Sequence, residues 1–419
     1  MLRRTLVLAG CLASSAMAAP TIEFLPAGYL VTDASYDGSV LVGNVQGDGS
    51  YETFRWTAEE GVVRLGRATV PVLGIGGGSP DVSYDGARVS ATILSSDILE
   101  TQGVWDEASG WTETMPPMPA NGVISDQSYG SAWGLSGDGT TLTGFYWIGG
   151  MGGAQVNTWT PSNGVVALPK TPGRSARGNG ANYDGTVVVG WEDLNGPWQP
   201  TAWRNGQKMV LVESLARGEA RATTADGDTI VGAAYNPAQA RTSATIWRWN
   251  GAAYVTEYLG FLPGTAPNSG SCWLESVSDS GDLAVGFNLY TFSPGGPVDG
   301  VVWTPATGIV KDVDFLASLG LSVPVGADIR EINVVSPNGE VITGIMLLPE
   351  IGLQTFVIHL NSCPADIDGD GLVDFSDLNI LLGNFNTSGA NIPGDINGDG
   401  VVSFADLNLL LNSYNTACS

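Results

Sequence analysis

The sequence contains a single histidine, His359. Histidine is the usual base of nucleophilic triads and the commonest nitrogen ligand of zinc, so one copy excludes His-based triads and multi-histidine metal sites. A Gly-x-Ser-x-Gly motif and a glycine-rich phosphate loop are also missing. These absences argue against the common hydrolase and nucleotide-binding classes, and a lone histidine in a strand-like segment is expected to be structural.

Positive charge is scarce, with 17 Lys and Arg against 42 Asp and Glu and a formal net charge of −25. So acidic a surface excludes nucleic acid and anionic membranes as favoured partners and is typical of a well-solvated exterior. After the N-terminal 18 residues, no stretch reaches the roughly 18 consecutive apolar residues that a membrane-spanning helix needs. The sequence therefore predicts no transmembrane segment.

Cysteine is limited to four residues, of which Cys11 falls in an N-terminal segment with the marks of an export signal. Residues 1–18 combine Arg3-Arg4, an apolar run from Leu6 to Ala13, and a small-x-small cleavage site at its end. The stretch ending at Cys11 also resembles a lipoprotein motif, so lipidation there stays an alternative. Export predicts a secreted, extracellular or cell-surface protein in which disulfides can form.

One phrase, Ser-x-Asp-Gly followed by alternating aliphatic residues and a further glycine, recurs with variations seven times between residues 20 and 361. Asp-Gly between β-rich runs is a strong hairpin signal. The turn glycines are Gly38, Gly86, Gly139, Gly185, Gly227, Gly281 and Gly339. Tryptophans recur with the same period, at Trp56, Trp105, Trp159, Trp203, Trp247 and Trp303. Four short strands per repeat of 40–60 residues predict a mainly β fold, a seven-bladed β-propeller.

The last repeat stops at its third strand, while the segment from Thr21 to Pro26 is a spare strand at the other end. We expect this segment to pair with residues 355–360, complete the seventh blade and remove the open sheet edges. The phrase from Phe54 to Gly66, together with the Ser-x-Asp-Gly turns, resembles the HAF-type extracellular repeat family. That resemblance implies secretion and no particular chemistry.

Within the propeller, the regular aspartates and tryptophans are interpreted as turn caps and blade packing. Irregular segments carry aromatic residues that could stack on a glycan: 145–147, 191–198, and 287–297 with Tyr290 and Phe292. Two carboxylates on the same face could instead form a glycoside hydrolase site. The sequence does not single out such a pair among 42 acidic residues.

Residues 363–418 contain one pattern twice, 29 residues apart, and each copy has the spacing of a calcium loop. Calcium takes about six to eight oxygens, chiefly from carboxylates and carbonyls at fixed loop positions, and needs a glycine at position 6. That glycine is Gly371 in one copy and Gly400 in the other. The ligand positions are Asp366, Asp368, Asp370, the Leu372 carbonyl, Asp374 and Asp377, then Asp395, Asn397, Asp399, the Val401 carbonyl, Ser403 and Asp406.

Each loop is followed by a helix with leucines on one face, and proline precedes each loop at Pro364 and Pro393, where an entering helix would lie. This doubled loop-and-helix unit resembles the type I dockerin family, in its GC-type variant. The resemblance implies two Ca²⁺ ions and docking, through residues 363–418, onto a cohesin-like protein or a cell-surface scaffold. The partner-reading positions depart from the family pattern, because they hold Phe375-Ser376 and Phe404-Ala405 in place of a small polar pair.

Cysteines flank this doubled unit at Cys363 and Cys418. Two antiparallel copies would bring these ends together, so we predict a Cys363–Cys418 disulfide that stabilises the module by about 4 kcal/mol. Cys272 is left over and is expected to be a buried thiol.

The predicted domains are a signal peptide (1–18), a seven-bladed propeller (20–361) and a small α domain of two calcium-binding loop-helix units (362–419). The predicted function is a secreted, non-catalytic propeller anchored by the calcium-dependent module and serving binding or display. The alternative is a polysaccharide-degrading enzyme of the glycoside hydrolase type, anchored in the same way.

Overall fold

The computed structural model describes residues 20–45, 52–67, 78–97, 99–115, 128–148, 153–193, 197–213, 217–267, 269–291, 296–360, 365–368, 372–387, 392–394, 396 and 401–417. The predicted signal segment and Cys11 lie outside these residues. The chain forms two compact units, of which the larger is Thr21–Leu360 and the smaller includes Asn361–Ser419. Among the described residues, no helix is long and apolar enough to cross a membrane.

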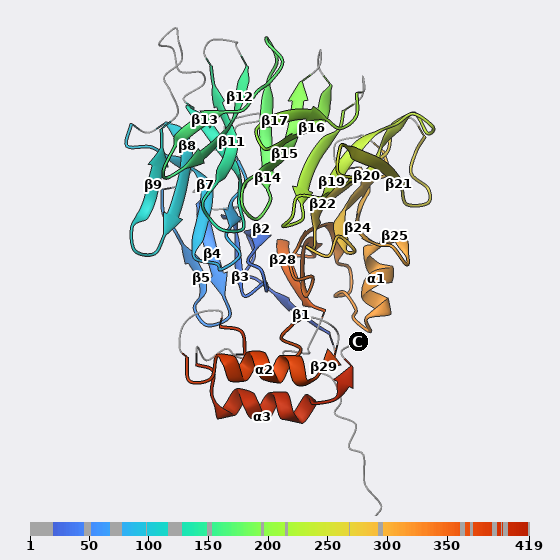
Figure 1. The fold of residues 1–419 in the computed structure, drawn as a ribbon. Helices are drawn as coiled ribbons and strands as arrows, with labels where there is room; N and C mark the ends of the chain where they lie inside the picture. Colours follow the sequence, from blue (N-terminus) through green and yellow to red (C-terminus); the bar gives the residue numbers. More distant parts are fainter. Residues whose placement is uncertain are drawn as a thin grey trace, which may run out of the picture. The chain divides into compact units, whose positions relative to one another are not determined.

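The larger unit consists of seven antiparallel four-stranded sheets, which confirms the predicted seven-bladed β-propeller (Figure 1). The first four blades are β2 (Tyr29–Ala34), β3 (Val40–Val45), β4 (Thr53–Thr57) and β5 (Gly61–Arg64); β6 (Asp81–Val82), β7 (Arg88–Leu94), β8 (Glu100–Asp106) and β9 (Gly110–Thr114); β10 (Gly130–Leu135), β11 (Leu142–Trp147), β12 (Ala154–Thr160) and β13 (Gly164–Ala167); and β14 (Ala176–Ala181), β15 (Val187–Asp193), β16 (Trp198–Arg204) and β17 (Gln207–Val210).

The last three blades are β18 (Glu219–Thr223), β19 (Thr229–Asn236), β20 (Arg241–Trp249) and β21 (Tyr254–Gly260); β22 (Ser271–Val277), β23 (Ala284–Leu289), β24 (Val298–Thr304) and β25 (Gly308–Lys311); and β26 (Asp328–Val335), β27 (Val341–Leu348), β28 (Gly352–His359) and β1 (Thr21–Phe24). A short helix, α1 (Asp312–Ser318), follows β25. The first strand of every blade contacts the first strand of the next, and β26 contacts β2, so the ring of blades is closed.

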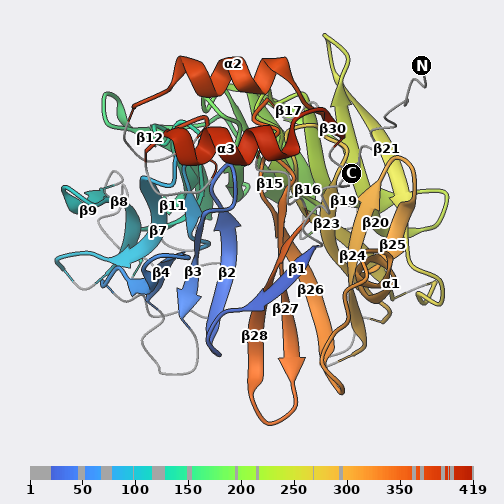
Figure 2. The same ribbon diagram turned by 90° about the horizontal axis from the view of Figure 1, so that it is seen from below.

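The N-terminal strand β1 completes the seventh blade by pairing antiparallel with β28, as predicted (Figure 2). The register runs from Thr21 opposite His359 to Phe24 opposite Phe356. The single histidine therefore lies in the sheet that closes the ring, and its Nε2 lies 3.2 Å from a carboxylate oxygen of Glu23 in β1. After the strand, Leu25 is buried in the core that blades one and seven share.

The seven Ser-x-Asp-Gly turns connect the first and second strands of the blades, and their side chains act locally. In the first turn, Asp37 Oδ1 accepts hydrogen bonds from Ser35 Oγ (3.1 Å) and from the Ser39 N–H (2.9 Å). Gly38 follows with a φ of 73°. The interpretation of these aspartates as turn caps is confirmed.

The second residues of the seven turns take part in a ring of hydrogen bonds that links each blade to the next. Six of the seven links join the backbone of these residues directly or through the N–H of the following residue, and the seven links run round the whole propeller. The N–H donors and their carbonyl acceptors are Tyr36 to Tyr84, Tyr84 to Gly137, Asp138 to Tyr183, Tyr183 to Ala225, Asp279 to Pro337 and Asn338 to Tyr36, and the Ala225 N–H donates to Asp279 Oδ1.

The glycine of the first turn offers a test of this close packing between blades. A Cβ at Gly38 would lie 2.4 Å from Val341 of blade seven, in addition to the strain of a positive φ. Gly38→Ala is expected to lower the free energy of unfolding by about 2–3 kcal/mol in urea titrations. Gly308→Ala is the matched control, because Gly308 also has a positive φ (66°) but nothing lies within 4 Å of its added Cβ. An equal loss in both variants would show that the packing between blades contributes nothing.

The repeated tryptophans lie on the third strands and pack between blades, as interpreted. Trp203 and Trp247 are fully buried. The indole N–H of Trp203 donates to the Pro169 carbonyl of the preceding blade at 2.7 Å. Cys272 is a buried free thiol, as expected, and burial raises its pKa to about 12.

The smaller unit contains two short strands, β29 (Leu372–Val373) and β30 (Thr416–Ala417), which pair with each other, and two helices, α2 (Phe375–Gly383) and α3 (Phe404–Ser413). Each helix begins with a capping box, formed by Asp374 with Asp377 and by Ser403 with Asp406. The core is small, and its buried residues are Ala365, Val373, Leu381, Val402 and Leu410.

Candidate functional sites

In the first calcium-loop sequence, three predicted ligands come together. Asp366, Asp368 and Asp377 each offer a carboxylate oxygen, and these oxygens lie within 4.8 Å of one another. Asp377 is buried, and its Oδ1 accepts hydrogen bonds from the N–H groups of Ile367 (2.6 Å) and Asp368 (3.1 Å). A carboxylate has about four lone-pair positions, so Asp377 can close the loop in this way and still ligate a cation. This donor set fits the hard-oxygen preference of Ca²⁺.

The second loop repeats the same arrangement where it is described. Asp406 is buried, its Oδ1 accepts from the Ile396 N–H at 2.9 Å, and its Oδ2 accepts from the Ser403 N–H at 2.8 Å. Leu372 lies in β29, and Val401 is half exposed. The remaining predicted ligands, Asp370, Asp395, Asn397 and Asp399, and the cysteines Cys363 and Cys418 lie outside the described residues.

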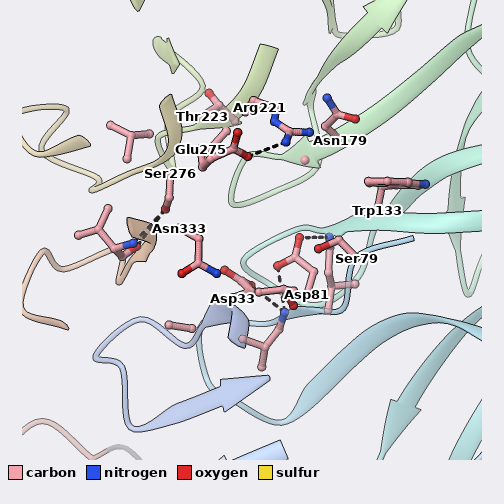
Figure 3. Close-up of a pocket in the computed structure, with 18 of the residues that line it drawn as sticks. Asp33, Ser79, Asp81, Trp133, Asn179, Arg221, Thr223, Glu275, Ser276 and Asn333 are labelled. Atoms are coloured by element: carbon pink, nitrogen blue, oxygen red, sulfur yellow. Dashed lines mark hydrogen bonds and ion pairs between the residues drawn. The ribbon is translucent and has the colours of Figure 1, made fainter. Parts of the chain in front are cut away.

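In the propeller, a cavity lies where the seven innermost strands meet. It has a volume of about 310 Å³ and is lined by residues from every blade (Figure 3). Tyr84 forms part of its wall, donates its hydroxyl to Asp279 Oδ1 at 2.9 Å, and contacts the rings of Tyr36 and Tyr183. One end of the cavity is therefore bordered by the turns that form the hydrogen-bond ring.

A β-bulge in the innermost strand supplies a wall residue in six blades. The extra residue lies where the register with the second strand shifts, for example between Val31 and Asp33. The bulge residues are Thr32, Trp133, Asn179, Arg221, Glu275 and Asn333, and Pro80 occupies the equivalent position in blade two. Each stands five residues before the third residue of its turn. Bulges re-aim side chains and are common beside functional sites.

Blades five to seven each contribute one charged residue to the wall: Arg221, Glu275 and Glu331. Arg221 forms ion pairs with Glu275 (2.7 Å) and Glu219 (3.2 Å), and Glu219 also pairs with the buried Arg177 (3.2 Å). Burial alone would raise the pKa of Glu219, but Arg221 and the other arginines hold it below its ordinary value. The guanidinium of Arg177 stacks on Trp133, 3.5 Å from the ring centre.

On the blade-one and blade-two side, Asp33 and Asp81 form a hydrogen-bonded carboxyl pair. Burial, and then the charge of Asp81, raises the pKa of Asp33 well above its ordinary value. Asp81 Oδ2 accepts from the Leu135 N–H at 2.8 Å, and Asp33 Oδ2 accepts from the Val82 N–H at 2.8 Å. Of the two carboxyl groups, Asp33 is the one whose charged form burial and the neighbouring carboxylate disfavour more strongly.

Glu331 also lines the cavity, and burial, together with the charge of Glu275, raises its pKa from 4.5 to about 7. Between these values the folded protein keeps a proton that the unfolded chain releases, so the free energy of unfolding falls as pH rises. We expect Glu331→Gln to remove this loss and to exceed the parent by about 2 kcal/mol near pH 8, with little difference near pH 4.5. Urea unfolding at both pH values tests this, with the exposed Glu257→Gln as control. A gain that does not depend on pH would contradict it.

The aromatic residues proposed for glycan stacking are mostly not on loops, which corrects that expectation. Phe145 and Trp147 lie in β11, Trp191 in β15, Trp198 in β16 and Phe287 in β23. Trp191 is buried and stacks on Trp198 at 4.5 Å, so their facing surfaces are already covered. Tyr290 follows β23 directly, and Phe292 lies outside the described residues. The wall residues share one sequence feature, a position five residues before the third residue of each turn, but their residue types vary and do not mark that position.

The sequence matches no protein-family model and no curated protein. An oligogalacturonate lyase from Vibrio parahaemolyticus is structurally similar, with a TM-score of 0.50 at 14% identity, over 81% of this chain and 91% of that chain. A prolyl endopeptidase gives a TM-score of 0.50 at 13% identity, over 81% of this chain and 48% of that chain. TolB from Acinetobacter baumannii gives 0.41 at 13% identity, over 66% of this chain and 63% of that chain.

The chain thus spans about half the length of the endopeptidase and under two thirds of the TolB chain. At these identities, the likeness to the lyase and the endopeptidase shows the propeller fold alone.

Proposed function

We propose that the protein is an exported, non-catalytic propeller that a calcium-dependent, dockerin-like module anchors in an extracellular complex or at the cell surface. The observation that carries this proposal is the convergence of Asp366, Asp368 and Asp377 within 4.8 Å at the start of a capped helix. The second copy supports it, because Asp406 closes its loop with the same contacts as Asp377. Bound calcium would supply the positive charge that such loops need to bring their carboxylates together.

A duplicated apolar surface supports docking of this module onto a partner. Phe375 is 64% exposed and Phe404 is 71% exposed, although both begin helices of a small domain. Leu382 and Leu411 stand seven residues later in α2 and α3 and are about half exposed. Exposed apolar side chains gathered on a small domain are typical of protein interaction sites. Residues 363–418 are therefore proposed to bind a cohesin-like protein or cell-surface scaffold.

The rival function is a polysaccharide-degrading glycoside hydrolase. Its two carboxyl groups would need to stand roughly 5–10 Å apart, whereas Asp33 and Asp81 hydrogen-bond directly to each other. This pair therefore does not have the spacing of a glycosidase, and we favour the non-catalytic function. Incubation of the full chain with a panel of polysaccharides should release no reducing sugar. Release that disappears in Asp81→Asn would establish the rival.

The anchoring proposal is tested by retention of the full chain on the surface fraction of the producing cells. Retention is expected in calcium and is expected to be lost in EGTA or in the variant Asp368→Ala/Asn397→Ala. Asp314→Ala, at an exposed aspartate of α1, is the matched control. Equal retention with and without calcium would refute calcium-dependent anchoring.

The predicted Cys363–Cys418 disulfide belongs to the same module. The pairing of Leu372 with Ala417 places the chain just before Cys418 beside the first loop, which supports the proposed linkage. Peptide mapping of the secreted protein without reduction should recover the two cysteines in one linked peptide. Loss of the link in Cys418→Ser should lower the free energy of unfolding of the module by about 4 kcal/mol. Recovery of Cys363 as a free thiol would refute the linkage.

A further inference from the structure

We infer that the central cavity of the propeller binds a neutral, polyhydroxylated small molecule of the size of one or two sugar units. The bulge residues of the innermost strands would supply the recognising side chains. The inference rests on the proposed role of the propeller as a binding module, but it is independent of calcium anchoring. A volume of about 310 Å³ lies at the lower end of small-molecule pockets, which run from roughly 300 to 1,000 Å³.

The contrast between layers of the cavity wall points to recognition rather than to packing. The residues two positions after each bulge position are small or aliphatic in six blades and threonine in one: Ala34, Val82, Leu135, Ala181, Thr223, Val277 and Val335. The bulge layer itself contains threonine, proline, tryptophan, asparagine, arginine and glutamate. Blades that pack alike need similar residues at equivalent positions. Diverse polar residues on a bulge therefore indicate a requirement beyond the fold.

Polar atoms with no protein partner show what chemistry the wall requires. Among the described residues, Arg221 Nε, Glu275 Oε1 and Trp133 Nε1 are buried without a hydrogen-bond partner, and all three side chains line the cavity. Leaving such a group unsatisfied is costly. The first and third atoms are donors and the second is an acceptor. A hydroxyl group both donates and accepts, so neighbouring sugar hydroxyls can satisfy Arg221 and Glu275 together.

The charge of the wall favours a neutral ligand over an anion. The guanidinium groups of Arg177 and Arg221 already form ion pairs with Glu219 and Glu275. The remaining charged groups of the wall are carboxyl groups, those of Asp33, Asp81 and Glu331. An added anion would bring further negative charge beside them into a partly buried site, which is costly. Hydroxyl groups add no net charge, so a neutral saccharide fits the wall better than a uronate.

Isothermal titration calorimetry on the full chain tests this inference with glucose, galactose, mannose, xylose and cellobiose, against galacturonate and glucosamine as charged analogues. We expect at least one neutral sugar to bind, galacturonate to bind about tenfold more weakly, and glucosamine to bind no more tightly than glucose. Trp133→Phe removes one donor and keeps the ring under Arg177, while Glu275→Gln keeps the size of the side chain. Each should weaken binding about tenfold, whereas Glu257→Gln, on the exposed strand β21, should leave it unchanged.

The possible outcomes separate cleanly. Absence of binding by every neutral sugar, with the cavity holding only water, overturns the inference. Tighter binding of galacturonate or glucosamine overturns the ligand class. Parent-like affinity in both Trp133→Phe and Glu275→Gln, with parent-like melting temperatures, overturns the site. A repeat in EGTA distinguishes this inference from the anchoring proposal, because sugar binding should persist when calcium is removed.

Discussion

Deletion of residues 20–27 is expected to lower the free energy of unfolding of the propeller by about 5 kcal/mol or more, much of the typical stability of a domain. The deletion removes β1 and its ladder with β28. It also removes the buried Leu25, whose N–H donates to the Thr355 carbonyl at 3.1 Å and whose carbonyl accepts from Gln354 Nε2 at 2.6 Å. The exposed edge of β28 would then invite pairing with other molecules.

Two point variants show whether the loss comes from closure of the seventh blade. Leu25→Ala should cost about 2–4 kcal/mol, because its side chain fills the core between blades one and seven. Phe24→Ala, on the adjacent residue of the same segment, should cost less than about 1 kcal/mol, because Phe24 is partly exposed. Thermal and urea unfolding measure all three proteins. An unchanged melting temperature after the deletion would refute closure by β1.

Calcium removal is expected to unfold the C-terminal module selectively and to leave the propeller folded. The described core of the module contains only five fully buried side chains, and small domains of this kind depend on metals or disulfides for stability. At free calcium about 100 times the dissociation constant, the ion contributes about 2.7 kcal/mol. EGTA should therefore raise the rate of proteolytic cleavage within residues 361–419 about a hundredfold, while fragment 21–360 persists.

Readdition of calcium should restore resistance, and magnesium at the same concentration should restore less, because it binds such flexible loops poorly. Asp368→Ala should be cleaved readily even in calcium. This variant isolates ligation, because the Asp368 side chain is exposed and is not part of the helix cap. Identical cleavage patterns in calcium and EGTA would contradict the prediction.

The propeller could be predicted from the sequence because its signals are local and repeated. Asp-Gly turns, alternating aliphatic residues and the spare segment from Thr21 to Pro26 each determine a strand or a turn without reference to distant residues. The pairing of β1 with β28 follows, since only the last repeat of the sequence stops at its third strand. The capped helices after Asp374 and Ser403 were visible for the same reason.

The cavity wall could not be predicted in this way. A bulge depends on where two strands fall out of register, and alternation of residue types does not reveal that position. Arg221 and Glu275 therefore look like ordinary strand residues in the sequence, although they form an ion pair in the cavity. The stacking of Trp191 on Trp198 depends on the pairing of β15 with β16, and sequence spacing alone placed both residues on an exposed segment. The hydrogen-bond ring likewise joins turns that lie about 40 residues apart or more.

Calorimetric titration of calcium into the metal-free, full-length protein tests the central claim most directly. The account predicts two calcium ions per chain, weakened binding at one site in Asp368→Ala, and weakened binding at both sites in Asp368→Ala/Asn397→Ala. Absence of calcium binding by the parent chain, or binding of two ions by the double variant with parent affinity, would contradict it.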